Sequence, residues 1–187
     1  KIQDISPSLL RKYFATLGNT FFWSGGDSAH GQELWKATSI PGSAKLVKDI
    51  YPGTQSSLPY AFVSYHNKLY FNALDSYADR SLYVTDGTSD GTQKIYSASS
   101  PAVTARDKLF FGGRDVNTGD ELYVSDGTTG GTKLLKDIYP GANSSNPYNL
   151  TVMDSTVYFA ATDDVHGNEL WKTNGKKNGT VLVKDIV

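Results

Sequence analysis

The chain matches itself four times along its length. Each match begins with a short motif of Glu or Ser, then Leu, then an aromatic residue, and the motifs recur at intervals of roughly 40 to 50 residues. The four copies are Glu33-Leu34-Trp35, Ser81-Leu82-Tyr83, Glu121-Leu122-Tyr123 and Glu169-Leu170-Trp171. A period of this length is typical of one propeller blade, so the repeat constrains the fold more than any other feature.

Each copy divides into four short runs of β-forming residues, and the second copy shows them most clearly. Its expected strands are 61–65, 68–73, 82–85 and 93–96. His66-Asn67 predicts a tight turn between the first two strands. The segment from Asp86 to Thr92, rich in Gly, Asp and Thr, predicts a hairpin between the last two.

These strands predict an all-β chain that folds as a β-propeller of four-stranded antiparallel blades. We expect a single repeat domain over residues 1–187, whose four blades stand alone or form part of a larger ring. The expected blades cover approximately residues 6–50, 51–98, 99–138 and 139–187. Ile2–Ile5 align with Val47–Ile50, so residues 1–5 predict a surplus fourth strand, and Ser6–Lys12 is a candidate helical turn. A β-solenoid is the alternative, although solenoid repeats are usually shorter.

Composition excludes several classes of partner. The chain has 18 Lys and Arg against 19 Asp and Glu, a formal net charge of -1, so no bulk field attracts it to nucleic acid. No apolar run is long enough to span a bilayer, which predicts no membrane insertion. Cysteine is absent, so disulfides and thiolate chemistry are excluded.

The repeats resemble a family of bacterial proteins named for the Glu-Leu-Trp-x-x-Asp-Gly-Thr motif. The resemblance spans nearly the whole chain and is strongest in 121–138 and 169–186. It is weaker where Thr38-Ser39 replaces Asp-Gly and where Ser81 replaces Glu. The resemblance implies a propeller-like array in a secreted or cell-surface protein, and it brings no established catalytic residues.

Candidate binding residues fall in two kinds of loop that we expect on one rim of the blades. One loop joins the second and third strands, and the other is the Tyr-Pro-Gly segment that follows the fourth strand. The candidates are the turn residues Asp27, His30, Asp163 and His166 and the loop tyrosines Tyr51, Tyr60, Tyr139 and Tyr148. Aromatic rings stack on sugar faces and polar side chains bind sugar hydroxyls, so this rim predicts carbohydrate binding.

We therefore expect a non-catalytic, lectin-like extracellular module that binds a glycan or cell-surface polymer and needs no cofactor. A glycoside hydrolase or polysaccharide lyase that uses carboxylates such as Asp27 and Asp163 is one alternative. A structural or assembly subunit is another, in which a second chain completes the ring as a homo-oligomer. Calcium is a further hypothesis, because Asp27 with Glu33, or Asp163 and Asp164 with Glu169, supply oxygen ligands. His30 and His166 occupy one column of the repeat, but we assign no metal site to them.

Overall fold

A computed structural model describes residues 13–77 and 79–186. The chain divides into two compact units, Lys1–Lys94 and Ile95–Val187, and the division falls within strand β8 (Gln93–Ser97). The expected strand at residues 1–5 and the expected turn at Ser6–Lys12 lie outside the described residues. In the described part of the chain, no helix is both long and apolar enough to cross a membrane.

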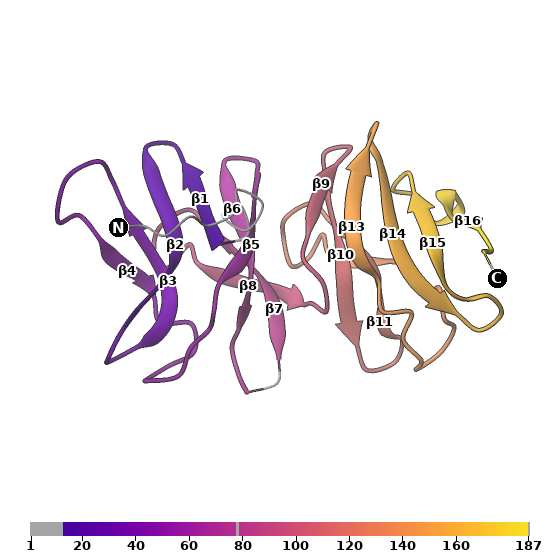
Figure 1. The fold of residues 1–187 in the computed structure, drawn as a ribbon, viewed down its shortest axis with the longest axis horizontal. Coiled ribbons are helices and arrows are strands. Elements are labelled where there is room, and N and C mark those ends of the chain that lie inside the picture. Colours follow the sequence, from indigo (N-terminus) through magenta and orange to yellow (C-terminus); the bar gives the residue numbers. More distant parts are fainter. Residues whose placement is uncertain (1–12, 78, 187) are drawn as a thin grey trace. The chain divides into compact units, whose positions relative to one another are not determined.

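The strands form four separate four-stranded antiparallel sheets, which we call blades 1 to 4 (Figure 1). In each blade the strands lie in the order of the sequence, as a simple meander. The all-β propeller architecture of four-stranded blades is thus confirmed, and the solenoid alternative is wrong. Each blade lies inside one of the four segments expected from the repeats.

The bounds of the strands follow the repeat closely. Blade 1 consists of β1 (Phe14–Leu17), β2 (Thr20–Asp27), β3 (Gly31–Ala37) and β4 (Lys45–Lys48). Blade 2 consists of β5 (Tyr60–Tyr65), β6 (Lys68–Leu74), β7 (Arg80–Thr85) and β8. Blade 3 consists of β9 (Val103–Ala105), β10 (Lys108–Asp115), β11 (Gly119–Ser125) and β12 (Lys133–Lys136). Blade 4 consists of β13 (Tyr148–Met153), β14 (Thr156–Asp163), β15 (Gly167–Thr173) and β16 (Thr180–Lys184), with a short 3-10 turn at Lys177–Gly179.

The first hairpin of blade 2 turns at His66-Asn67, as predicted. Both residues have positive φ, 46° and 56°, which is the conformation of a two-residue turn that matches the strand twist. Arg106-Asp107 and Asp154-Ser155 have the same conformation in blades 3 and 4. Three of the four blades therefore begin with the same turn chemistry.

Apolar side chains between the two blades of each unit form its core. In unit 1 this core includes Phe22, Leu34 and Phe71, and in unit 2 it includes Phe110, Leu122 and Phe159; all six are at most 1% exposed. The core residues come from the middle strands of both blades, so neither blade buries its apolar face alone. Burial of side chains of this size stabilises a fold by roughly 1.5–3 kcal/mol each.

The Asp-Gly-Thr turns are held by their own side chains. In blade 3, Asp126 Oδ1 accepts hydrogen bonds from the amide and the hydroxyl of Thr128, at 2.9 and 2.7 Å. Thr128 Oγ1 in turn accepts the Gly131 amide at 2.9 Å. Asp86 and Thr88 repeat these bonds in blade 2. The motif is therefore a self-contained hairpin turn, as the sequence predicts.

The two neighbouring glycines of the blade 3 turn provide a matched test. A Cβ at Gly131 would overlap the Asp126 carboxylate, whereas a Cβ at Gly130 would meet no atom within 4 Å. We expect Gly131→Ala to lower the free energy of unfolding by about 2 kcal/mol. Gly130→Ala should leave it unchanged or raise it by up to about 1 kcal/mol. Denaturant unfolding measures both, and equal effects would contradict this account of the turn.

Candidate functional site

The glutamate of the repeat motif is a buried clamp for the loop that leaves the blade. Glu33 is 0% exposed, and its carboxylate lies under the segment that connects blade 1 to blade 2. It accepts the amides of Ile50 at 2.8 Å, Ser57 at 2.9 Å and Tyr51 at 3.4 Å, and the hydroxyl of Ser57 at 2.5 Å. A single side chain therefore holds both ends of this connector.

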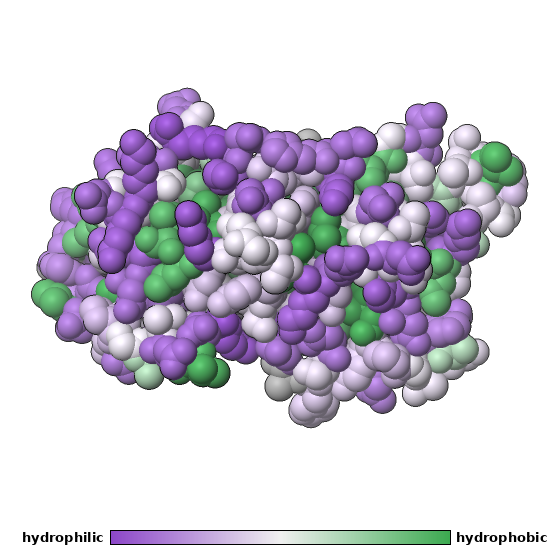
Figure 2. Space-filling view, turned by 180° about the vertical axis from the view of Figure 1, so that it is seen from behind, coloured by the Kyte–Doolittle hydropathy of each residue, from purple (hydrophilic) through white to green (hydrophobic). Residues whose placement is uncertain are grey.

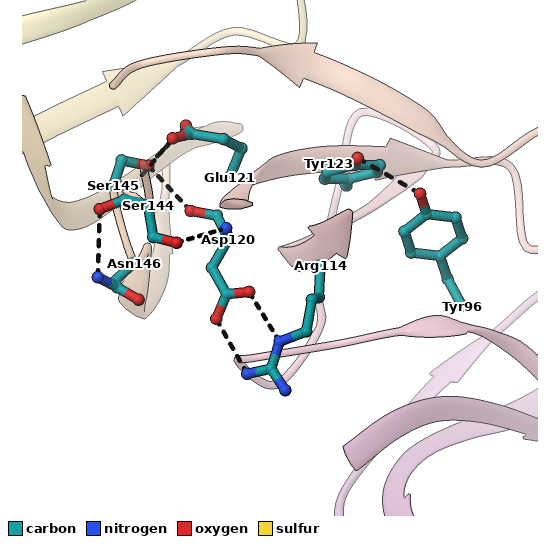
Figure 3. A network of polar contacts seen from close by, with 8 residues as sticks. All are labelled: Tyr96, Arg114, Asp120, Glu121, Tyr123, Ser144, Ser145 and Asn146. Atoms are coloured by element: carbon teal, nitrogen blue, oxygen red, sulfur yellow. Dashed lines mark hydrogen bonds and ion pairs between the residues drawn. The ribbon is translucent and has the colours of Figure 1, made fainter. Parts of the chain in front are cut away.

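Unit 2 repeats the clamp with Glu121, which is also 0% exposed (Figure 3). Its carboxylate accepts the amides of Ile138 at 2.8 Å and Ser145 at 2.9 Å, and the Ser145 hydroxyl at 2.6 Å. Burial raises the pKa of Glu33 and of Glu121, and the hydrogen bonds from the serines and the amides oppose that rise. Sequence reasoning treated this glutamate as a rim residue and missed the clamp, because its partners lie far along the chain.

The clamped connector lies beside the loop between the second and third strands, as predicted. The Gln32 amide donates to Ser56 Oγ at 2.9 Å, and in unit 2 the Asp120 amide donates to Ser144 Oγ at 2.9 Å. Gly31 has a φ of 65°, and a Cβ there would overlap the carbonyl of Gln55. Glycine at this position therefore allows the two loops to touch and to form one rim in each unit.

Blade 2 has no clamp, and its connector to the next strand is short. Ser81 stands in the glutamate position and donates to Asp75 at 3.3 Å. Asp75 also accepts the Tyr83 hydroxyl at 3.2 Å and pairs with Lys94 at 2.8 Å. Burial, with the Asp75 charge as the next cause, raises the pKa of Tyr83. The departure from the motif in this copy thus accompanies the loss of the loop that the glutamate holds.

The candidate aspartates and histidines pair within their own turns. Asp27 Oδ1 accepts the amides of Ala29 and His30, and His30 Nδ1 lies 2.9 Å from it. In unit 2, Asp163 accepts the His166 amide, and its Oδ2 lies 2.8 Å from His166 Nδ1. The hydrogen bond that each histidine makes to its aspartate raises the pKa of that histidine. The aspartates order their turns, and each imidazole has one nitrogen engaged with its aspartate.

The predicted tyrosines have different surroundings. Tyr51 and Tyr139 are half-buried in the clamped connectors. Tyr148 is 42% exposed, and its hydroxyl accepts the Asn168 side-chain amide at 2.8 Å. Tyr60 lies under a cation, because the Arg80 guanidinium carbon is 5.1 Å from its ring centre. Of the four tyrosines, Tyr60 lines a cavity.

This cavity is a hollow of about 410 Å³ in unit 1, which we call the Arg80 hollow. Its lining is Tyr13, Gln32, Leu58, Tyr60 and Arg80. Among the described residues, no carboxylate pairs with Arg80, so its donors face the hollow without a counter-ion. Sequence reasoning missed Arg80, because the position just before the repeat motif carries a different residue in each copy.

Unit 2 places different residues at the same positions. Asn168 stands in place of Arg80, and Asp120 in place of Gln32. Asp120 forms a two-point pair with Arg114, at 2.8 and 3.1 Å (Figure 3). In unit 2, Arg114 therefore pairs with Asp120, whereas Arg80 in unit 1 has no such carboxylate partner in the described structure.

The residues that the structure describes form no metal-binding site. No group of three His, Asp or Glu side chains gathers there in a way that could hold an ion. Glu33, one of the residues of the calcium hypothesis, already accepts four hydrogen bonds. The calcium hypothesis stays untested, and we build no chemistry on it.

Comparison with known proteins supports the fold alone. No family description and no curated protein matches the sequence. A puromycin hydrolase mutant complexed with PGG is similar in structure, with a TM-score of 0.58 and 11% identity; the match covers 94% of this chain and 29% of that one. Weaker matches are the computationally designed protein Ika8 (TM-score 0.49, 15% identity, 92% of this chain and 47% of that one) and an exo-β-1,3-galactanase from Phanerochaete chrysosporium with β-1,3-galactotriose (TM-score 0.43, 11% identity, 94% of this chain and 49% of that one). This chain thus spans less than half the length of each of these three proteins.

We expect Glu121→Ala to destabilise unit 2 by roughly 3 kcal/mol, because it leaves the buried amides of Ile138 and Ser145 without an acceptor. Glu121→Gln retains one acceptor oxygen and should cost roughly 1 kcal/mol. Hydrogen exchange at the Ile138 and Ser145 amides measures the local effect, and denaturant unfolding measures the total. Glu33→Ala is the control, since it should speed exchange at Ile50 and Ser57 instead. A loss below about 0.5 kcal/mol for Glu121→Ala would show that the clamp is dispensable.

The histidine turns should be visible in a titration. We expect His30 and His166 to titrate above the ordinary pKa of 6.5, because each aspartate stabilises the charged imidazole. The contact therefore stabilises the turn fully below pH 6.5 and is lost as the pH rises through the raised pKa. NMR of the imidazole protons measures this shift. Asp27→Asn should lower the pKa of His30 and leave that of His166 unchanged; a pKa of His30 that does not respond would refute the pairing.

Proposed function

We propose that this protein is a non-catalytic, extracellular binding module that holds carbohydrate at its loop rim, with the Arg80 hollow as the main contact. The observation that carries the proposal is a guanidinium over the Tyr60 ring, in a hollow of about 410 Å³, without a carboxylate partner in the described structure. Small-ligand sites in proteins commonly have volumes of about 300 to 1,000 Å³. The hollow therefore has the size and the polar groups of a site for one or two sugar rings.

The chemistry of the lining favours a sugar that carries a carboxylate. A guanidinium binds a carboxylate through two parallel hydrogen bonds, and the Gln32 side chain can bind hydroxyls as donor and acceptor. Tyr13, which is 45% exposed, and Tyr60 offer the apolar surface on which a sugar ring packs. We therefore expect a uronic or other acidic sugar to bind more tightly than its neutral counterpart.

A comparison of the two units separates the residues that serve the blade from those of the hollow. The clamp is the same in both units, with Glu33 and Ser57 in one and Glu121 and Ser145 in the other. The hollow differs, because Arg80 corresponds to Asn168. Since unit 2 forms its blades with asparagine there, the architecture of the blade does not require the arginine. We therefore assign Arg80 a role in ligand binding.

The hydrolase alternative has no comparable support. The carboxylates of Asp27 and Asp163 accept hydrogen bonds from the amides and the histidine of their own turns. The puromycin hydrolase structure is only 11% identical to this chain, so it supports the fold and not an activity. The proposal therefore assigns catalysis to none of these groups. An extracellular location follows from the resemblance of the repeats to secreted bacterial proteins.

A glycan array with acidic and neutral oligosaccharides, followed by calorimetry on the best ligand, tests the proposal. We expect Arg80→Ala to weaken binding of an acidic glycan roughly 10- to 100-fold, the value of a charge-assisted hydrogen-bond pair. Arg80→Lys should recover part of the affinity, because it keeps the charge but not the planar fork. Asn168→Ala is the matched control in unit 2 and should have little effect.

Two outcomes would contradict the proposal. One is the absence of binding to every glycan on the array by folded wild-type protein. The other is binding that Arg80→Ala leaves unchanged, which would place the site elsewhere. Turnover of a polysaccharide by the wild type would replace the proposal with the hydrolase alternative.

A further inference from the structure

A second cavity lies in unit 2, at the end of the blades that is opposite to the rim. Strand β10 runs from this cavity, at Lys108, to the rim loop that follows Asp115. The cavity has a volume of about 270 Å³, and we call it the basal cavity. Its lining is Lys108, Val124, Ser125, Asp126, Gly130, Gly131 and Lys133 of blade 3 and Gly175 of blade 4. The end of unit 2 that carries these turns is at the top of Figure 1, and Figure 2 shows mainly hydrophilic side chains along that edge.

Strand pairing places two lysines on one face of blade 3. Phe110 pairs with Val124, and Val124 pairs with Lys133, so these side chains point to the same side of the sheet. Lys108 precedes Phe110 by two residues and therefore shares that face. Phe110 and Val124 belong to the core between blades 3 and 4, and a Cβ at Gly175 would lie 3.3 Å from the Phe110 ring. The two lysines therefore lie at the basal end of this core, where the blade 4 turn closes over it.

The basal cavity carries an excess of positive charge. Neither Lys108 nor Lys133 has a hydrogen-bond acceptor or an ion-pair partner among the residues that the structure describes. Asp126 also lines the cavity, but its Oδ1 accepts the amide and the hydroxyl of Thr128. The hydrogen bonds from Thr128 lower the pKa of Asp126, and the charge of Lys108 lowers it further, so this carboxylate is ionised at neutral pH. The lining therefore has two positive charges and one negative charge.

Unit 1 has a cavity of about 280 Å³ at the equivalent place, with different charges. Its charged lining residues are Lys36, in the position of Val124, and Asp86. Lys36 Nζ donates to the carbonyl of Gly87 in the blade 2 turn, so this lysine joins the two blades. The lining of the unit 1 cavity is therefore neutral, and its lysine already has an acceptor within the fold.

Three replacements make the basal cavity of unit 2 more positive than its counterpart. They are Thr20 to Lys108 in the lining, and Asp86 to Asn174 and Thr88 to Lys176 in the turn on either side of the conserved glycine. The replacement of Lys36 by Val124 acts the other way, but the lysine that it removes is the one that bonds within the fold. Since unit 1 forms its blades and turns without the additional charges, the architecture does not require them. An anionic ligand gives them a role.

We propose that the basal cavity of unit 2 binds an oxyanionic ester group, a sulfate or a phosphate, between the ammonium groups of Lys108 and Lys133. Lysine binds such groups as a compact point charge with three donors. The cavity is smaller than the about 300 Å³ at which sites for whole small molecules begin, so it takes the charged group and leaves the rest of the ligand outside. This site is independent of the Arg80 hollow, which lies in unit 1.

NMR titration of the full chain with methyl sulfate, methyl phosphate and the neutral ester trimethyl phosphate tests the proposal. We expect saturable shifts of the Gly130, Gly131 and Gly175 amides with the two charged esters and none with the neutral one. The tighter of the two charged esters identifies the kind of group that the site prefers. Binding should weaken as sodium chloride is added, because salt screens exposed charges.

Substitutions separate the role of the two lysines from that of surface charge in general. Lys108→Ala and Lys133→Ala should each weaken binding about tenfold, the value of one charge-assisted hydrogen bond. Lys45→Ala is the matched control, because Lys45 stands in the position of Lys133 in unit 1. Asn174→Asp returns the blade 4 turn to the Asp-Gly form of blades 2 and 3, so the turn still forms. It should weaken binding roughly threefold, because it brings back a negative charge.

Several results would overturn the proposal. Folded wild-type protein that shows no saturable shift with either charged ester would have no such site. Affinity that both lysine variants leave unchanged, or that Lys45→Ala lowers as much, would place the binding elsewhere. Inorganic sulfate or phosphate that binds where neither ester does would be an adventitious ion only. Circular dichroism checks that the lysine variants are folded, and Asn174→Asp gives a readout that removes no lysine; an unchanged affinity in that variant would also contradict the proposal.

Discussion

The buried carboxylate of the repeat glutamate is the contact on which the rest of this structure depends. Glu33 and Glu121 each replace water with three backbone amides and a serine hydroxyl, so a charge that would be costly in the core is compensated locally. The clamp fixes where the connector leaves one blade and starts the next. It thereby sets the distance at which the two blades pack and places the loops of the rim.

The clamp occurs in every other junction between blades, which gives the chain a two-blade unit. Blade 2 has Ser81 in place of the glutamate, and at the position of Lys48 it has Tyr96, whose hydroxyl donates to that of Tyr123 at 3.3 Å. A short connector follows, and its Ser99 and Ser100 bind the backbone of Gly112. The repeat is therefore a tandem of two paired blades as well as four single ones. The variation between copies has a physical reason, since the glutamate, the lysine and the long connector are all present in blades 1 and 3 and all absent in blade 2.

The sequence predicts the blades well because strands, tight turns and their spacing are local properties. The pattern in blade 2 places β6 and β7 within two residues of their observed ends, and His66-Asn67 forms the expected turn. Contacts between residues far apart in the chain are a different matter. The spacing of Glu33 and Ser57 gives no sign that they touch, and Arg80 lies just before the repeat motif at a position where the four copies carry different residues. The loops of the rim could be predicted from the sequence. The contacts between their side chains could not, because they depend on how distant segments pack.

The residues that differ between the two units carry more information about function than those that recur. A residue that recurs between blades serves a need that those blades share, as Asp126 and Thr128 in blade 3 and Asp86 and Thr88 in blade 2 do in the turn. Where equivalent positions carry different residues and both blades still form, the residue found only once is not needed for the blade and serves a local function. Arg80 satisfies this condition, because Asn168 occupies the same strand position in unit 2. Since no described carboxylate pairs with Arg80, its partly desolvated guanidinium is one that a bound carboxylate would stabilise.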